Sequence, residues 1–417
     1  MKTMKLTSFI LSVVLLIGFA SCNELSTQPN EDKKIDLDSK SAQLVEANNA
    51  FGLELFQKIR QNSTEDNIMV SPLSVSLALG MAYNGADGDT KTEMEEAMKL
   101  NGLTSEQVNI SYKMLVAALQ SLDEDVVFEI ANAIFYKNGF TIKQNFLDLN
   151  NTYYDAEVDD LDFSGPAALE TINGWVADKT HNKITKILNE LTPNDRMALL
   201  NAIYFYGTWT TRFDEDGTKM RTFTKKDGTE MEVQMMNKED KLLYASNKLF
   251  SAVQLPYGNG QYNMVVMLPG QGQTSEDIIG ELNAGNWENW APGFQEQDHV
   301  VVTMPRFKFG YETGLKKVLK DMGMVKAFSD SEADFSEISD EYLFISSAIH
   351  KTYIDVNETG TEAAAVTALV FTTTSVGPEG PQKIYFTVDR PFVFAITEKD
   401  THAILFIGEV QNPEYED

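Results

Sequence analysis

A long stretch near the C-terminus, residues 356–390, constrains this chain more than any other part. Within it, residues 361–376 contain neither Gly nor Pro, and most of them are Ala, Val or Thr. Loops usually rely on Gly and Pro for their turns, whereas β-branched residues favour strands. A connection of this length in a compact domain is often functional. We interpret it as a strand held outside its sheet, with a mobile Ala/Thr linker as the alternative.

With a side-chain period of two, this stretch has two different faces. One face begins with Glu362, and the other carries Thr361, Ala363, Ala365, Thr367, Leu369 and Phe371. A carboxylate must keep its water, so the second face is the one that can be buried. Its first three residues are small enough to enter between two existing strands.

Two motifs in this region resemble those of inhibitory serpins. Residues 358–365 resemble the reactive-loop hinge of that family, and residues 386–396 resemble its C-terminal signature. The match continues in order from about residue 41 to residue 413. The resemblance implies a single α+β serpin domain over residues 41–417, with three mixed β-sheets, about eight or nine helices and an exposed reactive-centre loop at residues 358–381. It assigns the hinge to Glu358, Gly360, Thr361, Glu362, Ala363, Ala364 and Ala365.

Local patterns support the same fold class. Ser71-Pro72 predicts a helix start, and residues 104–107 form a capping-box pattern. Strands are expected at residues 126–136 and 197–205, with hairpin turns at Asp216-Gly217 and Asp227-Gly228. Helices come first and strands mostly later, which is typical of an α+β fold.

Asn201 and His350 each fall on an otherwise apolar strand face. A buried amide or imidazole without a partner costs roughly 1–3 kcal/mol, so we expect both to be hydrogen-bonded. The resemblance places them, with Ser71 and Ser74, in the shutter beneath the point where the large sheet opens. Two unrelated core residues are the alternative.

The base of the loop should contain a breach with its own contacts. Glu358 is expected to pair with a cation, and Arg306 is the candidate that matches the family. Trp209 is expected to pack at the same breach, with a simple core aromatic as the alternative reading.

The resemblance implies a suicide inhibitor whose loop is attacked as a substrate. Counting from the hinge places the reactive bond at Thr374-Ser375, although residues 377–381 make the loop longer than usual. A small residue there suits elastase-like or subtilisin-like serine proteases, and a papain-like cysteine protease is a further candidate partner. Phe371, for a chymotrypsin-like target, is the alternative. A non-inhibitory serpin-fold binding protein or chaperone is the competing hypothesis.

The N-terminus predicts export. Residues 1–21 have early lysines and then an apolar run too short to span a bilayer, as in a signal peptide. Residues 19–22 resemble a bacterial lipoprotein cleavage box, with ordinary cleavage after Ala20 as the alternative. Cys22, the only cysteine, would then carry the lipid and residues 22–40 would form a tether. We expect an outer-membrane lipoprotein, periplasmic or at the cell surface, that contacts the membrane only through this anchor.

Composition excludes several other classes. The net charge of −28 argues against nucleic acid, heparin or anionic lipid as the main partner. The four histidines show no metal-ligand spacing, and no nucleophile elbow or zinc-protease motif occurs. We therefore expect no metal, no cofactor and no enzymatic activity, and we expect a monomer.

Overall fold

A helical layer opens the fold, because apolar residues recur at helical spacing along the first third of the chain. Leu44, Phe51 and Leu55 are buried on one face of the first helix. Our computed structural model describes residues 34–192, 194–361 and 382–415. Its α-helices are α1 (Ser39–Asn62), α2 (Pro72–Tyr83), α3 (Gly88–Ala97), α4 (Ser105–Gln120), α5 (Gln144–Tyr154), α6 (Pro166–Lys179), α7 (Ser275–Glu281), α8 (Ala284–Trp290) and α9 (Lys316–Asp321).

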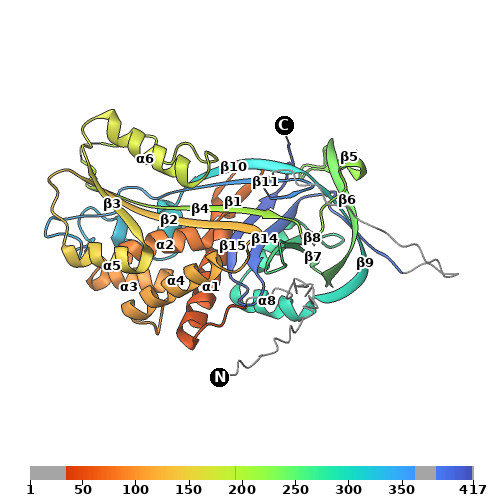
Figure 1. Cartoon of the computed structure of the whole chain (residues 1–417), viewed down its shortest axis with the longest axis horizontal. Coiled ribbons are helices and arrows are strands. Elements are labelled where there is room, and N and C mark those ends of the chain that lie inside the picture. Colours follow the sequence, from red (N-terminus) through yellow and green to blue (C-terminus); the bar gives the residue numbers. More distant parts are fainter. Residues whose placement is uncertain (1–33, 193, 362–381, 416–417) are drawn as a thin grey trace, which may run out of the picture. The chain divides into compact units, whose positions relative to one another are not determined.

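The six-stranded sheet is the part that positions the candidate site. Its strands lie in the order β10 (Phe307–Gly314), β11 (Ile349–Val356), β12 (Gly360–Thr361), β4 (Met197–Thr208), β2 (Val126–Lys137) and β3 (Ala156–Leu161). Figure 1 shows α6 on one face of this sheet and α1, α2 and α4 on the other. Helices therefore cover parts of both faces of the sheet, and a small second core lies beneath α6, around Phe135, Ile172 and Val176.

The second sheet has nine strands and contains the C-terminus of the fold. Its order is β1 (Ile68–Val70), β15 (Ile404–Val410), β14 (Phe392–Glu398), β8 (Tyr262–Pro269), β7 (Phe250–Tyr257), β6 (Glu230–Ser246), β9 (Gln295–Pro305) and β13 (Ile384–Thr387), with β5 (Lys219–Thr224) paired to β6. The long strand β6 pairs with β5, β7 and β9 along its length.

The α+β class with mixed sheets is confirmed, and the described residues contain nine α-helices. The described strands form two hydrogen-bonded sheets, whereas three were expected. The reason is β6, which is 17 residues long and continues from one group of strands into the next, so the two groups are one ladder. No helix in the described part of the chain is both long and apolar enough to cross a bilayer.

Candidate functional site

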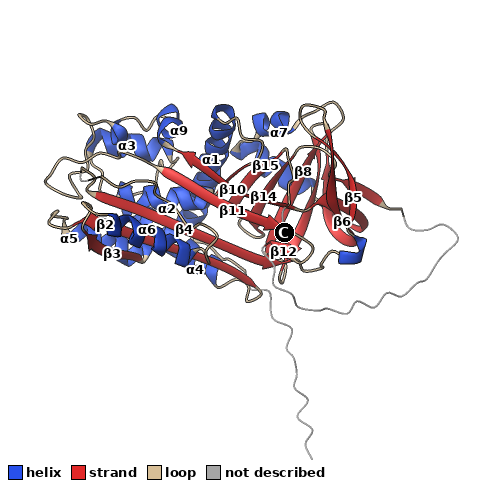
Figure 2. Ribbon diagram, turned by 90° about the horizontal axis from the view of Figure 1, so that it is seen from above, coloured by secondary structure: helices blue, strands red, loops and turns tan. Residues whose placement is uncertain are grey.

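The six-stranded sheet is split between β4 and β11. At one end, β12 lies between them: Thr361 is opposite Val356 of β11 and Gly207 of β4. Beyond these two residues, β4 pairs with β2 and β11 pairs with β10. Among the described strands no ladder joins β4 directly to β11 (Figure 2). The sheet therefore has an opening the width of one strand, which β12 has only begun to fill.

A cavity of about 820 Å³ lies along this opening. We call it the slot. It has β4 on one side, β11 on the other, α2 beneath it and the segment after α6 above it, and Thr361 stands at one end. Its lining includes Ser71, Ser74, Val75, Ile184, Ile187, Leu199, Asn201, Ile203, Phe205, His350, Thr352 and Ile354. Most of the lining side chains carry no charge, so most of the slot suits an uncharged strand. The charged residues in the lining are Lys183, Glu190, Asp195, Arg196 and Lys351.

Gly360 is required by the close approach of β12 to β4. A Cβ atom on Gly360 would lie 2.1 Å from the carbonyl oxygen of Gly207, a backbone atom that cannot move aside cheaply. Only glycine therefore allows the chain to enter the sheet at this point.

Thr361, the first side chain inside the sheet, is buried. It is 4% exposed, and its Oγ1 lies 2.5 Å from the hydroxyl of Tyr257. The Tyr257 ring stacks on Trp209, with centroids 4.4 Å apart and planes 14° apart. Trp209 in turn donates from Nε1 to the carbonyl of Asn357 at 2.9 Å, and its backbone N–H donates to Thr359. The breach expected around Trp209 is thus a continuous set of contacts that ends on the hinge.

Glu358 is held at the base of the loop by its charge and by its backbone. Its carboxylate lies 2.7 Å from Nε of Arg306, as expected, and accepts a hydrogen bond from the Thr218 hydroxyl. Its carbonyl accepts from the backbone N–H of Phe213 at 3.0 Å. Glu358 is only 3% exposed, so an unpaired carboxylate here would be costly and the pairing is essential to the hinge.

The expected shutter residues all line the slot, but they fall on its two sides. On the β11 side, Nε2 of His350 accepts from the backbone N–H of Ser71 at 3.0 Å, and Ser71 caps α2 by accepting from Ser74. On the β4 side, Asn201 donates to Asn132 of β2 at 2.8 Å. Within the described residues, the buried Oδ1 of Asn201 has no hydrogen-bond partner. His350 thus bonds to the start of α2, whereas Asn201 bonds to β2.

His350 is neutral in the folded protein. Burial lowers its pKa to about 4, and its unprotonated Nε2 is required to accept from Ser71. Unfolded histidine titrates near pH 6.5. Between pH 6.5 and 4, His350 is therefore protonated in the unfolded chain but stays neutral in the folded protein.

Stability should consequently fall with pH in that window. The contribution of His350 is complete above pH 6.5, and about 3 kcal/mol of it is lost as the pH falls to 4. His350→Gln keeps an acceptor for the Ser71 N–H but cannot take the proton, so its urea midpoint should depend less on pH between 6.5 and 4. Equal pH dependence in the two proteins would contradict a neutral buried His350.

Several expected site residues lie outside the described residues: Cys22, Glu362, Ala363, Ala364, Ala365, Thr374 and Ser375. Two contributors were missed from sequence. Asn132 interrupts an apolar strand much as Asn201 does, and that pattern could have identified it. Tyr257 gave no signal, because nothing local relates it to Thr361, 104 residues away.

Comparison with known proteins decides the family. The family model described as serpin (serine protease inhibitor) matches residues 46–413. The chain is a serpin. Iripin-2 of Ixodes ricinus is 35% identical over 378 residues, covering 89% of this chain and 94% of that protein. Serpins are generally protease inhibitors rather than catalysts, and they generally bind target proteases.

Two solved serpin structures are similar to this one. Tengpin, a thermophilic serpin in its native state, has a TM-score of 0.80 at 32% identity, with 91% of this chain and 96% of tengpin covered. Thyroxine-binding globulin in complex with thyroxine also has a TM-score of 0.80, at 28% identity, with 89% of this chain and 100% of that chain covered. The family thus includes a member that binds a small molecule.

Proposed function

We propose that this serpin is an irreversible suicide-substrate inhibitor of elastase-like or subtilisin-like serine proteases. A target attacks the reactive loop and forms an acyl-enzyme. The cut segment after Thr361 then enters the slot as a new strand and carries the acylated protease with it. The observation that supports this is the slot itself, because β12 has already begun the strand that would fill it.

The register of β12 predicts how far insertion would run. Thr361 is opposite Gly207, and the pairing is antiparallel. Continuing residue by residue places Phe371 opposite Met197, the far end of β4. The inward face would then be the one that begins with Thr361, which is uncharged throughout, small as far as Thr367 and large at Leu369 and Phe371. An uncharged face suits the slot, because most of its lining side chains carry no charge.

The same register favours the bond Thr374-Ser375. A cut there leaves a segment that extends beyond the end of β4, so insertion can be complete before the acyl bond is reached. A cut after Phe371 would place the acyl bond at the last pairing position, and trapping would be weaker. The small residues around Thr374 suit proteases whose primary pocket is small.

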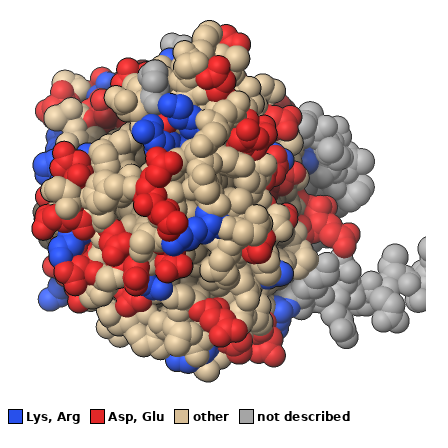
Figure 3. Space-filling model, turned by 90° about the vertical axis from the view of Figure 1, so that its left-hand side faces the viewer, with Lys and Arg blue, Asp and Glu red and all other residues tan. Residues whose placement is uncertain are grey.

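The surface charge fits a protein partner better than a polyanion. Figure 3 shows one face on which carboxylates are widely spread and Lys and Arg form no continuous patch. With a net charge of −28, encounter with a cationic protease would be faster at low ionic strength.

Incubation with pancreatic elastase, followed by a denaturing gel, tests the proposal. An inhibitor gives a covalent band whose mass is close to the sum of the two proteins. The competing hypothesis is a non-inhibitory binding protein, as in thyroxine-binding globulin, a serpin that binds thyroxine. Such a protein would be cleaved without any covalent band, even when subtilisin replaces elastase, and that result would refute inhibition of these classes.

A further inference from the structure

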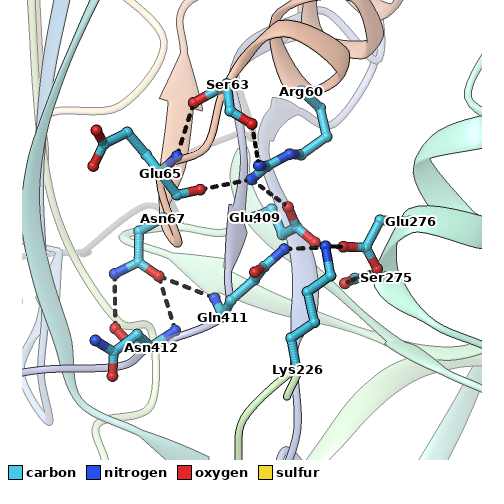
Figure 4. A network of polar contacts seen from close by, with 10 residues as sticks. All are labelled: Arg60, Ser63, Glu65, Asn67, Lys226, Ser275, Glu276, Glu409, Gln411 and Asn412. Atoms are coloured by element: carbon cyan, nitrogen blue, oxygen red, sulfur yellow. Dashed lines mark hydrogen bonds and ion pairs between the residues drawn. The ribbon is translucent and has the colours of Figure 1, made fainter.

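The C-terminal tail, residues 411–415, returns from the end of β15 to the hinge. Its start is fixed by Asn67, as Figure 4 shows: Oδ1 of Asn67 accepts from the backbone N–H groups of Gln411 and Asn412, both at 3.0 Å. Asn67 also donates to the carbonyl of Asn412 at 2.7 Å. Just before the tail, the buried carboxylate of Glu409 pairs with Arg60 at 3.2 Å. The direction in which the tail leaves β15 is therefore set by three backbone bonds to one side chain.

The tail then crosses β10 and ends beside the turn that joins β11 to β12. Lys308 of β10 donates its backbone N–H to the carbonyl of Glu414 at 3.1 Å. The ring of Tyr415 lies 5.5 Å from the guanidinium carbon of Arg306 and 5.7 Å from the ammonium of Lys308. Its hydroxyl lies 3.4 Å from Nδ2 of Asn357.

Both Arg306 and Asn357 hold the hinge turn. Arg306 pairs with Glu358, and its Nη1 donates to Gln234 at 2.7 Å. Asn357 donates its backbone N–H to the carbonyl of Gly360 at 3.0 Å, and its carbonyl accepts from Trp209. The ring of Tyr415 therefore contacts Arg306, the cation that binds Glu358, and its hydroxyl contacts the side chain of Asn357, which closes the turn.

We propose that Tyr415 is a positioning residue of the hinge, which holds Arg306 and Asn357 so that Gly360 and Thr361 stay paired between β4 and β11. An aromatic face stabilises a guanidinium placed over it and restricts its orientation. Arg306 then presents Nε to Glu358 in one geometry. The consequence for inhibition rests on the proposed function: a hinge already in register begins insertion sooner after the cut.

Hydrogen exchange on the uncut protein tests the positioning role without any protease. Tyr415→Ala should speed exchange of the backbone amides of Gly360 and Thr361 about three- to fivefold, the factor expected from one cation–π contact. Tyr415→Phe keeps the ring over Arg306 and loses only the 3.4 Å contact of the hydroxyl with Asn357, so its rate should stay closer to wild type than that of Tyr415→Ala. Glu414→Ala changes an exposed side chain on the same tail and is the matched control. An unchanged rate in Tyr415→Ala, or equal acceleration throughout β6 and β14, would overturn the proposal.

The effect on inhibition is measured separately, as the number of serpin molecules consumed per elastase molecule inhibited. This number should rise about three- to fivefold in Tyr415→Ala and stay near the wild-type value in Tyr415→Phe and Glu414→Ala. A normal number in Tyr415→Ala would refute the role in insertion. If the wild-type protein forms no complex at all, the proposed function fails, and the exchange experiment still decides whether Tyr415 positions the hinge.

Discussion

Thr361→Arg should convert this serpin from an inhibitor into a substrate. Thr361 is buried between β4 and β11, and its hydroxyl already lies against Tyr257. An arginine there would place a charge without a partner inside the sheet, at a cost of several kcal/mol. We expect the arginine to displace β12 from the sheet, so insertion after the cut would first have to bury this charge while hydrolysis of the acyl-enzyme continued. We expect the covalent elastase band to fall at least about tenfold, because about 1.4 kcal/mol already changes the partition tenfold.

Glu362→Arg is the matched control for this prediction. It introduces the same side chain one residue later, on the face that alternation assigns to solvent. It should therefore form the covalent complex nearly as well as the wild-type protein. If Thr361→Arg formed the complex undiminished, the assignment of faces would be wrong, whatever the second variant did.

Local signals along the chain predicted local structure well. Ser71 caps α2 with Pro72 in its first turn, and Thr104 and Gln107 form the expected capping box. In these cases the residues that determine the structure are within four positions of each other. Asp227-Gly228 lies at the turn between β5 and β6, as expected.

The prediction of a hairpin at Asp216-Gly217 was wrong, because residues 215–217 form a short 3₁₀ helix. Asp214 caps that helix by accepting from the backbone N–H of Asp216. The dipeptide Asp-Gly favours several kinds of turn, and here a preceding capping carboxylate selected another one. The side-chain context of the turn decided the outcome.

The contacts of the site could be predicted only where the resemblance supplied them. Arg306 and Glu358 are 52 residues apart, and only the family pattern suggested pairing them. Tyr257 and Tyr415 are absent from the sequence-based predictions, because each reaches the hinge through a chain reversal that has no local signature. The slot could not be inferred either, since periodicity describes one strand at a time and does not show which strands fail to pair.

Cleavage within the loop should make the protein much more stable to heat. Among the described strands of the uncut chain, only β12 lies between β4 and β11, at one end of the slot. The edges of β4 and β11 that face each other are therefore not paired to a described strand along most of their length. Filling it forms ladder hydrogen bonds on both sides of the new strand and buries the apolar lining. A net gain of about 10 kcal/mol would raise the melting temperature by about 12 °C for a domain of this size, because the unfolding entropy is about 2.1 cal/mol/K per residue. Calorimetry before and after a limited elastase nick measures the change.

The control that assigns this gain to insertion is the nicked Thr361→Arg protein. It carries the same cut, but insertion beyond β12 would have to bury the charge at position 361, so its melting temperature should rise by less than half as much. If the cut acted only by breaking the connection between β12 and β13, without insertion, it would stabilise the wild-type protein and Thr361→Arg equally. If nicked and intact wild-type protein melted at the same temperature, insertion of a strand into the slot would release no free energy. The energy needed to carry a protease across the molecule would then have no source in this fold.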